Sequence, residues 1–121
     1  MERIIKTGNG WRLGWQPNAS QYNGLVAGEN WAIELTEAEL NDFCRLAKQL
    51  SDTMQQMTTE LMEEEKISCE AESEQLWMEV EGYPSAYSLH FILYSGRGAE
   101  GKWPPAAVSE MITAIETLKV F

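Results

Sequence analysis

Residues that commonly carry chemistry are scarce in this sequence, which has one histidine and two cysteines in 121 residues. Cys44 and Cys69 do not form a C-x-x-C pair, so the usual zinc and dithiol redox motifs are missing. We expect both to be reduced, buried thiols, because free cysteine packs as a small hydrophobe. His90 lies within "LHFILY" and is expected to pack in a strand rather than act as a general base. The sequence therefore predicts no catalytic residue, no cofactor and no metal site.

Long hydrophobic runs are also missing. No stretch reaches the roughly 18 apolar residues of a membrane-spanning helix, and the start, "MERIIKTGNGWRLGW", lacks the apolar run of a signal peptide. We therefore expect a soluble, cytoplasmic protein that does not associate with a membrane. With 44% hydrophobic residues the chain is long enough to bury one core, which predicts a single domain over residues 1–121.

Positive charge is the third scarce property. Nine basic side chains face nineteen acidic ones, for a net charge of -10. Residues 36–82 carry this whole excess, with thirteen acidic side chains against Arg45, Lys48 and Lys66. Such an acidic surface keeps a protein soluble and repels the phosphates of nucleic acids.

Two β-hairpins are predicted at the start of the chain. "RIIKT" and "WRLGW" flank Gly8-Asn9-Gly10, whose residues readily adopt the positive φ of a tight turn. "LVA" and "WAIEL" flank residues 28–30, and in the second of these runs apolar and other side chains alternate. The pattern indicates a hairpin with one face in solvent.

A long helix is predicted next. Thr36 is a suitable N-cap, and Glu39 three residues later completes a capping box. Apolar side chains then recur at spacings of three and four from Leu40 to Leu61, which predicts a helix of about 27 residues. The same spacing fits a coiled coil, but complementary flanking charges are lacking, so we favour packing across a sheet.

The second half repeats this order of elements. "KISCEAES" and "QLWMEVEG" alternate as two strands with an acidic outer face, from which Trp77 also points outward. "AYSLHFILYS" reads as a central strand, and Pro104-Pro105 suit the opening of a final helix. The buried stripe of that helix is Val108, Met111, Ile112, Ile115 and Leu118. The sequence thus predicts an α+β fold of two halves, each made of antiparallel strands followed by a helix.

A literal G-x-G-x-x-G occurs at Gly96, Gly98 and Gly101. A dinucleotide-binding loop needs a following parallel strand with an acidic residue about 20 positions on, and here the sequence given stops 20 residues after Gly101. We therefore expect a flexible connection whose glycines allow positive φ, and no bound nucleotide.

Three segments together resemble a small family of uncharacterised cyanobacterial domains. They are "NGWRLGW", "NWAIELTEAEL" and "LHFILYSGRGAEGKWPPAAV", and the most specific part is Arg97-Gly98-x-Glu100-Gly101-x-Trp103. The resemblance implies strongly curved antiparallel sheets similar to those of the single-stranded-DNA-binding Whirly and transcriptional-coactivator domains. It implies no catalytic or cofactor-binding residue.

These observations favour a non-enzymatic domain that acts through protein contacts, and they leave a homodimer open. The alternative, by fold analogy, is single-stranded nucleic-acid binding, for which a basic groove would have to be assembled by folding. The cations available for that groove are Arg3, Lys6, Arg12, Arg97 and Lys102. The candidate interaction surface comprises Arg97, Glu100, Lys102, Trp103 and Trp77. An Arg97–Glu100 ion pair that only shapes the loop is the alternative interpretation.

Overall fold

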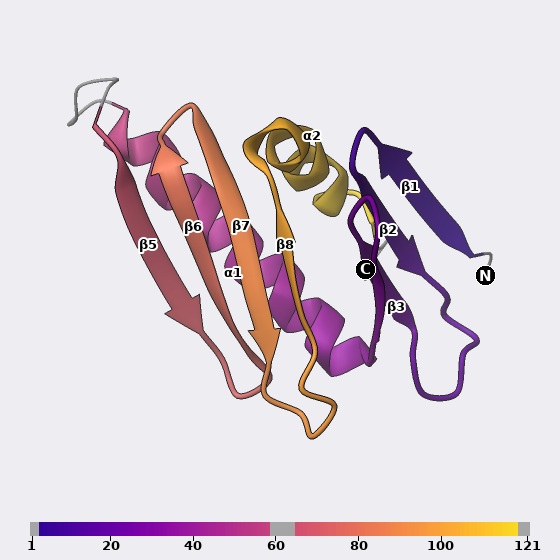
Figure 1. The fold of residues 1–121 in the computed structure, drawn as a ribbon. Coiled ribbons are helices and arrows are strands. Elements are labelled where there is room, and N and C mark those ends of the chain that lie inside the picture. Colours follow the sequence, from indigo (N-terminus) through magenta and orange to yellow (C-terminus); the bar gives the residue numbers. More distant parts are fainter. Residues whose placement is uncertain (1–2, 59–64, 119–121) are drawn as a thin grey trace.

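The computed structural model describes residues 3–58 and 65–118, which form two four-stranded sheets and two helices. In chain order the elements are β1 (Ile4–Gly8), β2 (Trp11–Trp15), β3 (Gly24–Ala27), β4 (Ala32–Leu35), α1 (Glu37–Met57), β5 (Ile67–Glu72), β6 (Leu76–Tyr83), β7 (Ala86–Leu93), β8 (Glu100–Trp103) and α2 (Pro105–Ile115). Each sheet is an open antiparallel meander followed by a helix (Figure 1). The predicted α+β fold of two similar halves is confirmed.

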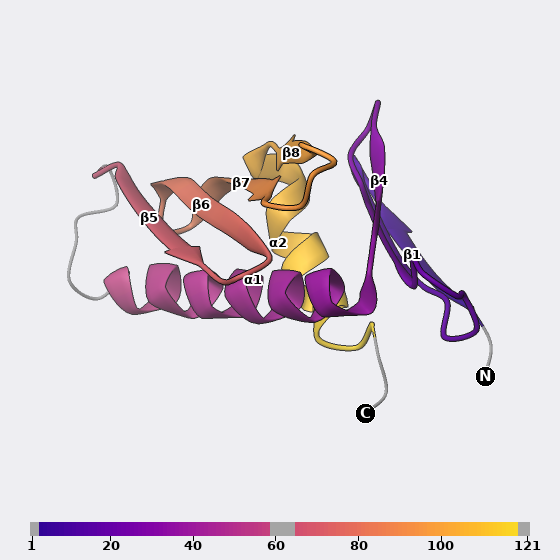
Figure 2. The ribbon, with the colours of Figure 1, turned by 90° about the horizontal axis from the view of Figure 1, so that it is seen from below.

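The two helices occupy different layers. α1 lies across one face of β5 and β6, and its first turns reach β3 and β4. α2 lies between the sheets, where it contacts β7 on one side and β1 and β2 on the other. In both views, the opposite face of β5–β8 is not covered by either helix of the described chain (Figures 1 and 2).

The capping box at the start of α1 is confirmed. The Glu39 amide donates to Thr36 Oγ1 (3.2 Å), and the Thr36 amide donates to Glu39 Oε1 (2.9 Å). The buried stripe packs on the second sheet rather than in a coiled coil; its members are Leu40, Phe43, Leu46, Ala47, Leu50 and Met54. The helix has 21 residues instead of about 27, and at its end the Thr58 hydroxyl donates to the Gln55 carbonyl (2.7 Å). Leu61 lies outside the described residues.

Aromatic rings join the two halves of the protein. Trp103 is fully buried, lies 4.9 Å from Trp31 and stacks on Phe91 at 5.6 Å between ring centroids. Phe43 of α1 contacts both Phe91 and Trp103. The indole of Trp103 also donates a hydrogen bond of 2.8 Å to the Ala27 carbonyl in the first sheet. The candidate assignment of Trp103 to an interaction surface is therefore wrong, because the ring belongs to the core.

The expectation of a flexible connection is wrong for residues 100–103, which form β8 and pair with β7. Gly98 has a φ of +61° and turns the chain just before this strand. Gly101 is buried against the Trp31 indole, where a Cβ would lie 2.3 Å from the ring. The glycines of the G-x-G-x-x-G therefore serve a turn and a close aromatic contact.

The two cysteines differ from expectation in their burial. Neither cysteine forms a disulfide bond, but Cys44 and Cys69 are half-buried rather than buried. Cys69 lies on β5, an edge strand of its sheet, and Cys44 lies beside a groove between the helices. Their place at the margins of the core explains the remaining exposure.

Candidate interaction surface on the second sheet

The face of β5–β8 that points away from α1 gathers most of the candidate surface. Side chains alternate along each strand, so those between the buried positions point outward. We call this set the outer face; its members are Ser68, Glu70, Glu72, Trp77, Glu79, Glu81, Ser88, His90, Ile92, Glu100 and Lys102. Residues from 35 positions of sequence are thus brought onto one flat surface.

The strand register arranges this face in rows. One row crosses the four strands as Glu72, Trp77, Ile92 and Glu100. The next row crosses them as Glu70, Glu79, His90 and Lys102. The central members, from β6 and β7, are half-buried, and the outer members are exposed. The centre of these two rows therefore holds Trp77, Ile92, His90 and the carboxylate of Glu79, and charged side chains lie on the two outer strands.

Trp77 and His90 meet at that centre. Their rings are 5.3 Å apart between centroids at 87°, an edge-to-face contact. Trp77 Nε1 donates to Glu70 Oε2 (3.3 Å), and His90 Nε2 lies 2.8 Å from Glu100 Oε2. Each ring is thereby fixed to a carboxylate on an outer strand.

The remaining carboxylates of the outer face, apart from those bonded to Trp77 and His90, also have partners. Ser68 Oγ donates to Glu79 Oε2 (2.9 Å), and the Tyr94 hydroxyl donates to Glu72 Oε2 (2.5 Å). The hydrogen bond to Glu72 is the largest cause that raises the pKa of Tyr94, followed by desolvation and by the charges of Glu72 and Glu70. Glu81 lies 3.9 Å from the ammonium of Lys66.

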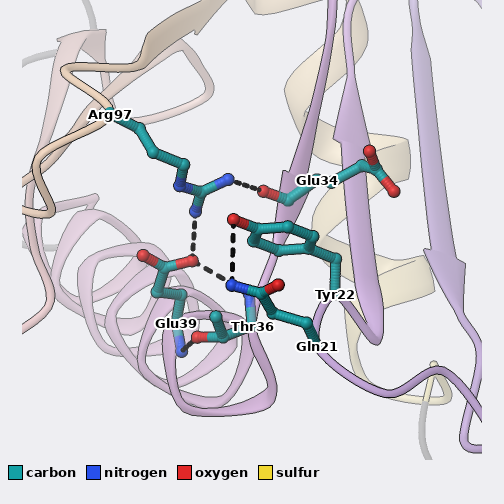
Figure 3. Close-up of polar contacts among 6 residues, drawn as sticks. All are labelled: Gln21, Tyr22, Glu34, Thr36, Glu39 and Arg97. Atoms are coloured by element: carbon teal, nitrogen blue, oxygen red, sulfur yellow. Dashed lines mark hydrogen bonds and ion pairs between the residues drawn. The ribbon is translucent and has the colours of Figure 1, made fainter.

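Arg97 lies elsewhere, at the junction of the two halves (Figure 3). It donates to the Glu34 carbonyl of β4 and to the Glu39 carboxylate at the start of α1, and its guanidinium lies 4.8 Å above the Tyr22 ring. The Glu39 side chain is only 4% exposed and the Arg97 side chain 30%, so the carboxylate of this ion pair is largely desolvated. The predicted Arg97–Glu100 pair is wrong, because Glu100 is paired with His90 instead.

A groove of about 490 Å³ lies between the two helices, away from the outer face. Its apolar lining includes Cys44, Ile115 and Leu118. Lys48 borders it and reaches Asp52 and Glu116, each at 3.1 Å. Hydrogen bonds to these two carboxylates are the main cause that raises the pKa of Lys48. Within residues 3–58 and 65–118, nothing shows what covers this groove.

Comparison with known proteins identifies the family. The sequence profile of a domain of unknown function, DUF1818, matches residues 6–118. The chain belongs to this family. A crystal structure of a protein with unknown function from Prochlorococcus sp. NATL2A, described as a member of the DUF155 family, is 29% identical to this DUF1818 domain. It superposes with a TM-score of 0.91 over 97% of this chain and 98% of that chain. No curated protein sequence matches the chain.

Membrane-spanning helices and metal sites are two further features that bear on the possible roles of this DUF1818 domain. Neither helix in the described ranges is long and apolar enough to cross a membrane. Among the same residues, His, Cys, Asp and Glu side chains form no group of three or more with the arrangement of a metal site. The outer face offers aromatic contact and negative charge.

Of the five residues predicted for the interaction surface, Trp77, Glu100 and Lys102 lie on the outer face, and Arg97 and Trp103 do not. The sequence analysis missed His90 and Ile92 as members of this surface. His90 is half-buried as a strand residue, but it points outward rather than into the core. The alternation of side chains along β7 could have predicted that His90 and Ile92 point outward. That alternation was hard to see because both faces of this strand carry apolar residues.

Proposed function

We propose that this DUF1818 domain acts through contact with another protein, which binds the outer face, and that it catalyses no reaction. One observation carries the proposal: Trp77, His90 and Ile92 come together at the centre of a sheet face that neither helix of the described chain covers. A partly exposed aromatic centre with a polar margin is the usual anatomy of a protein interface.

Burial elsewhere supports this choice of surface. The inner faces of both sheets, α1 and α2 contribute to one continuous hydrophobic core. Trp103, Phe91 and Phe43 are fully enclosed there, whereas Trp77 keeps part of its ring in solvent. Tryptophan is enriched in the buried centres of protein interfaces, which favours this part of the sheet as the contact surface.

Photocrosslinking in the native cell tests the proposal. A photoreactive amino acid in place of Ile92 samples the outer face, and the same substitution at Gln49, exposed on α1, is the matched control. We expect mass spectrometry to identify a protein crosslinked from position 92 and not from position 49. Equal crosslinking from both positions, or none from position 92, would refute the proposal.

Single-stranded nucleic-acid binding receives less support from the same geometry. Arg97 is engaged by Glu39 and the Glu34 carbonyl, and Lys102 shares the outer face with five carboxylates, the nearest in sequence being Glu100 on the same strand. Two of the five cations that a groove would need are therefore already paired or lie on an acidic surface. Such a site would repel the phosphates it has to bind.

We further propose a cyanobacterial source, a soluble cytoplasmic location and a relationship to Whirly-like folds. The similarity to the Prochlorococcus protein supports the source, and the pair of open antiparallel sheets, each followed by a helix, supports the relationship. A homodimer stays a prediction. Light scattering at increasing protein concentration tests it, since a dimer would double the mass.

A further inference from the structure

We propose that the outer face binds a lysine- or arginine-rich segment of the partner, with one cation over Trp77 and between Glu70 and Glu79. This inference rests on the proposed function and gives the partner a chemical class.

Charge complementarity is the first argument. The outer face has one lysine, Lys102, against five carboxylates: Glu70, Glu72, Glu79, Glu81 and Glu100. Lys66 lies near Glu81, but the donors to Glu79, Glu70 and Glu72 are the uncharged side chains of Ser68, Trp77 and Tyr94. A neutral or acidic partner would therefore bury negative charge that is not compensated, which is costly. A basic segment would pair these carboxylates, and it would also gain in association rate from the long-range attraction.

The register of β5 and β6 supplies an independent argument. Glu70 and Glu79 are direct cross-strand partners, and like charges in that position destabilise a sheet. Ser68 and Trp77 each donate one hydrogen bond to this pair, but neither donor carries a positive charge. A cation placed between the two carboxylates would relieve the repulsion that the sheet otherwise retains.

Trp77 defines where that cation would lie. Its indole is the most favourable aromatic ring for a cation–π contact, and its N–H already points to Glu70. Glu79 is two residues further along the same strand and therefore projects from the same face. A guanidinium or ammonium over the ring would meet a carboxylate on either side.

The layout of the carboxylates also suits an extended segment. Glu79 and Glu81 alternate along β6, as Glu70 and Glu72 do along β5. Alternate residues of an extended chain are spaced by about 7 Å, the same spacing that these glutamates have along their strands. Basic residues at every second position would therefore face successive glutamates.

Nuclear magnetic resonance with model peptides tests the inference. The probe is a peptide with lysine at alternate positions, compared with one that has glutamate at the same positions. We expect the lysine peptide to shift the Trp77 indole signal, assigned by its loss in Trp77→Phe, and to leave the buried Trp103 signal in place. A lysine peptide that does not shift the Trp77 signal, or a glutamate peptide that shifts it equally, would overturn the inference.

A matched pair of variants separates local recognition from net charge. Glu79→Gln removes a carboxylate from the outer face, and Glu29→Gln removes one from the turn between β3 and β4. We expect Glu79→Gln to raise the Kd of the lysine peptide about two- to fivefold and Glu29→Gln to leave it unchanged. Equal effects of the two variants would reduce the binding to non-specific attraction and overturn the inference. Thermal melting checks the fold, and we expect Glu79→Gln to melt no lower than the parent because it relieves the repulsion from Glu70.

The two proposals fail in different ways. A partner crosslinked from position 92 through a segment without lysine or arginine would overturn this inference and leave the protein-contact function standing. If no protein crosslinked specifically from position 92, both proposals would be refuted. Saturable binding of RNA or of Mg²⁺ alone to the outer face, measured with the same Trp77 signal, would also overturn the inference of a basic segment.

Discussion

The guanidinium of Arg97 pairs with the carboxylate of Glu39, a residue 58 positions earlier in the chain. The same carboxylate oxygen also accepts the Thr36 amide, so one atom completes the capping box of α1 and fastens the β7–β8 loop to it. Arg97 extends the connection to the Glu34 carbonyl of the first sheet. A single side chain therefore connects the second sheet's β7–β8 loop to the first sheet and to the start of α1.

Arg97→Ala should lower the free energy of unfolding by about 1–3 kcal/mol, because it leaves the Glu39 carboxylate buried without its cation. Arg45→Ala is the control, since Arg45 pairs with Asp42 on the exposed side of α1 and should cost under about 1 kcal/mol. Urea unfolding measures both. Equal losses in the two variants would show that the Arg97 contact adds nothing beyond a surface ion pair.

Gly101→Ala should destabilise the protein by about 1–3 kcal/mol, because the added methyl group overlaps the Trp31 ring. Gly96→Ala is the matched control, since a Cβ there meets nothing within 4 Å. We expect its melting temperature to stay near that of the parent. If Gly101→Ala were tolerated as well as Gly96→Ala, the close packing of Trp31 on β8 would be wrong.

Tyr94 should ionise later than an ordinary tyrosine as pH rises. Its protonated hydroxyl donates to Glu72, and the resulting phenolate would be repelled by the carboxylates, so its pKa is raised above 10.0. The stabilisation from this contact is present below pH 10.0 and is lost as pH rises through the folded-state pKa. Carbon-13 spectra of the tyrosine rings give the titration.

Glu72→Gln should return the pKa of Tyr94 toward its ordinary value, because it replaces the charged acceptor of the Tyr94 hydrogen bond and removes its negative charge. Glu29→Gln, in the turn between β3 and β4, serves as the control and should not move it, since Glu29 is not among the causes of the shift. Identical Tyr94 titrations in the parent and in Glu72→Gln would contradict the contact.

Single-stranded DNA and RNA should not bind measurably at about 150 mM salt, since too few free cations are available to release counterions from phosphates. The five tryptophans give the readout, because a base that stacks on an exposed indole quenches its fluorescence. A saturable, salt-sensitive curve at micromolar concentrations or below would instead support the nucleic-acid interpretation.

Local sequence signals were sufficient for much of the fold. The glycine turn between β1 and β2 and the Thr36–Glu39 capping box depend on neighbouring residues, and both were predicted. β8 was missed because Glu100, Gly101 and Lys102 have the composition of a loop. This segment becomes a strand only because β7 offers a free edge for pairing.

The candidate surface was predictable only in part, for a related reason. Alternation along β6 placed Trp77 outward, as a property of one strand. Its neighbours Glu70, His90 and Ile92 come from two other strands, and their proximity depends on register. The Arg97–Glu39 pair likewise depends on how distant segments fold together, which no local pattern encodes.

The hydrogen bond from Trp103 to Ala27 makes the two similar halves mutually dependent. Trp31 of the first half in turn fills the space that Gly101 of the second half leaves open. The interior of each half is therefore completed by contacts with the other half. The halves should unfold in one cooperative transition, and two fragments divided after α1 should regain native structure only when they are mixed.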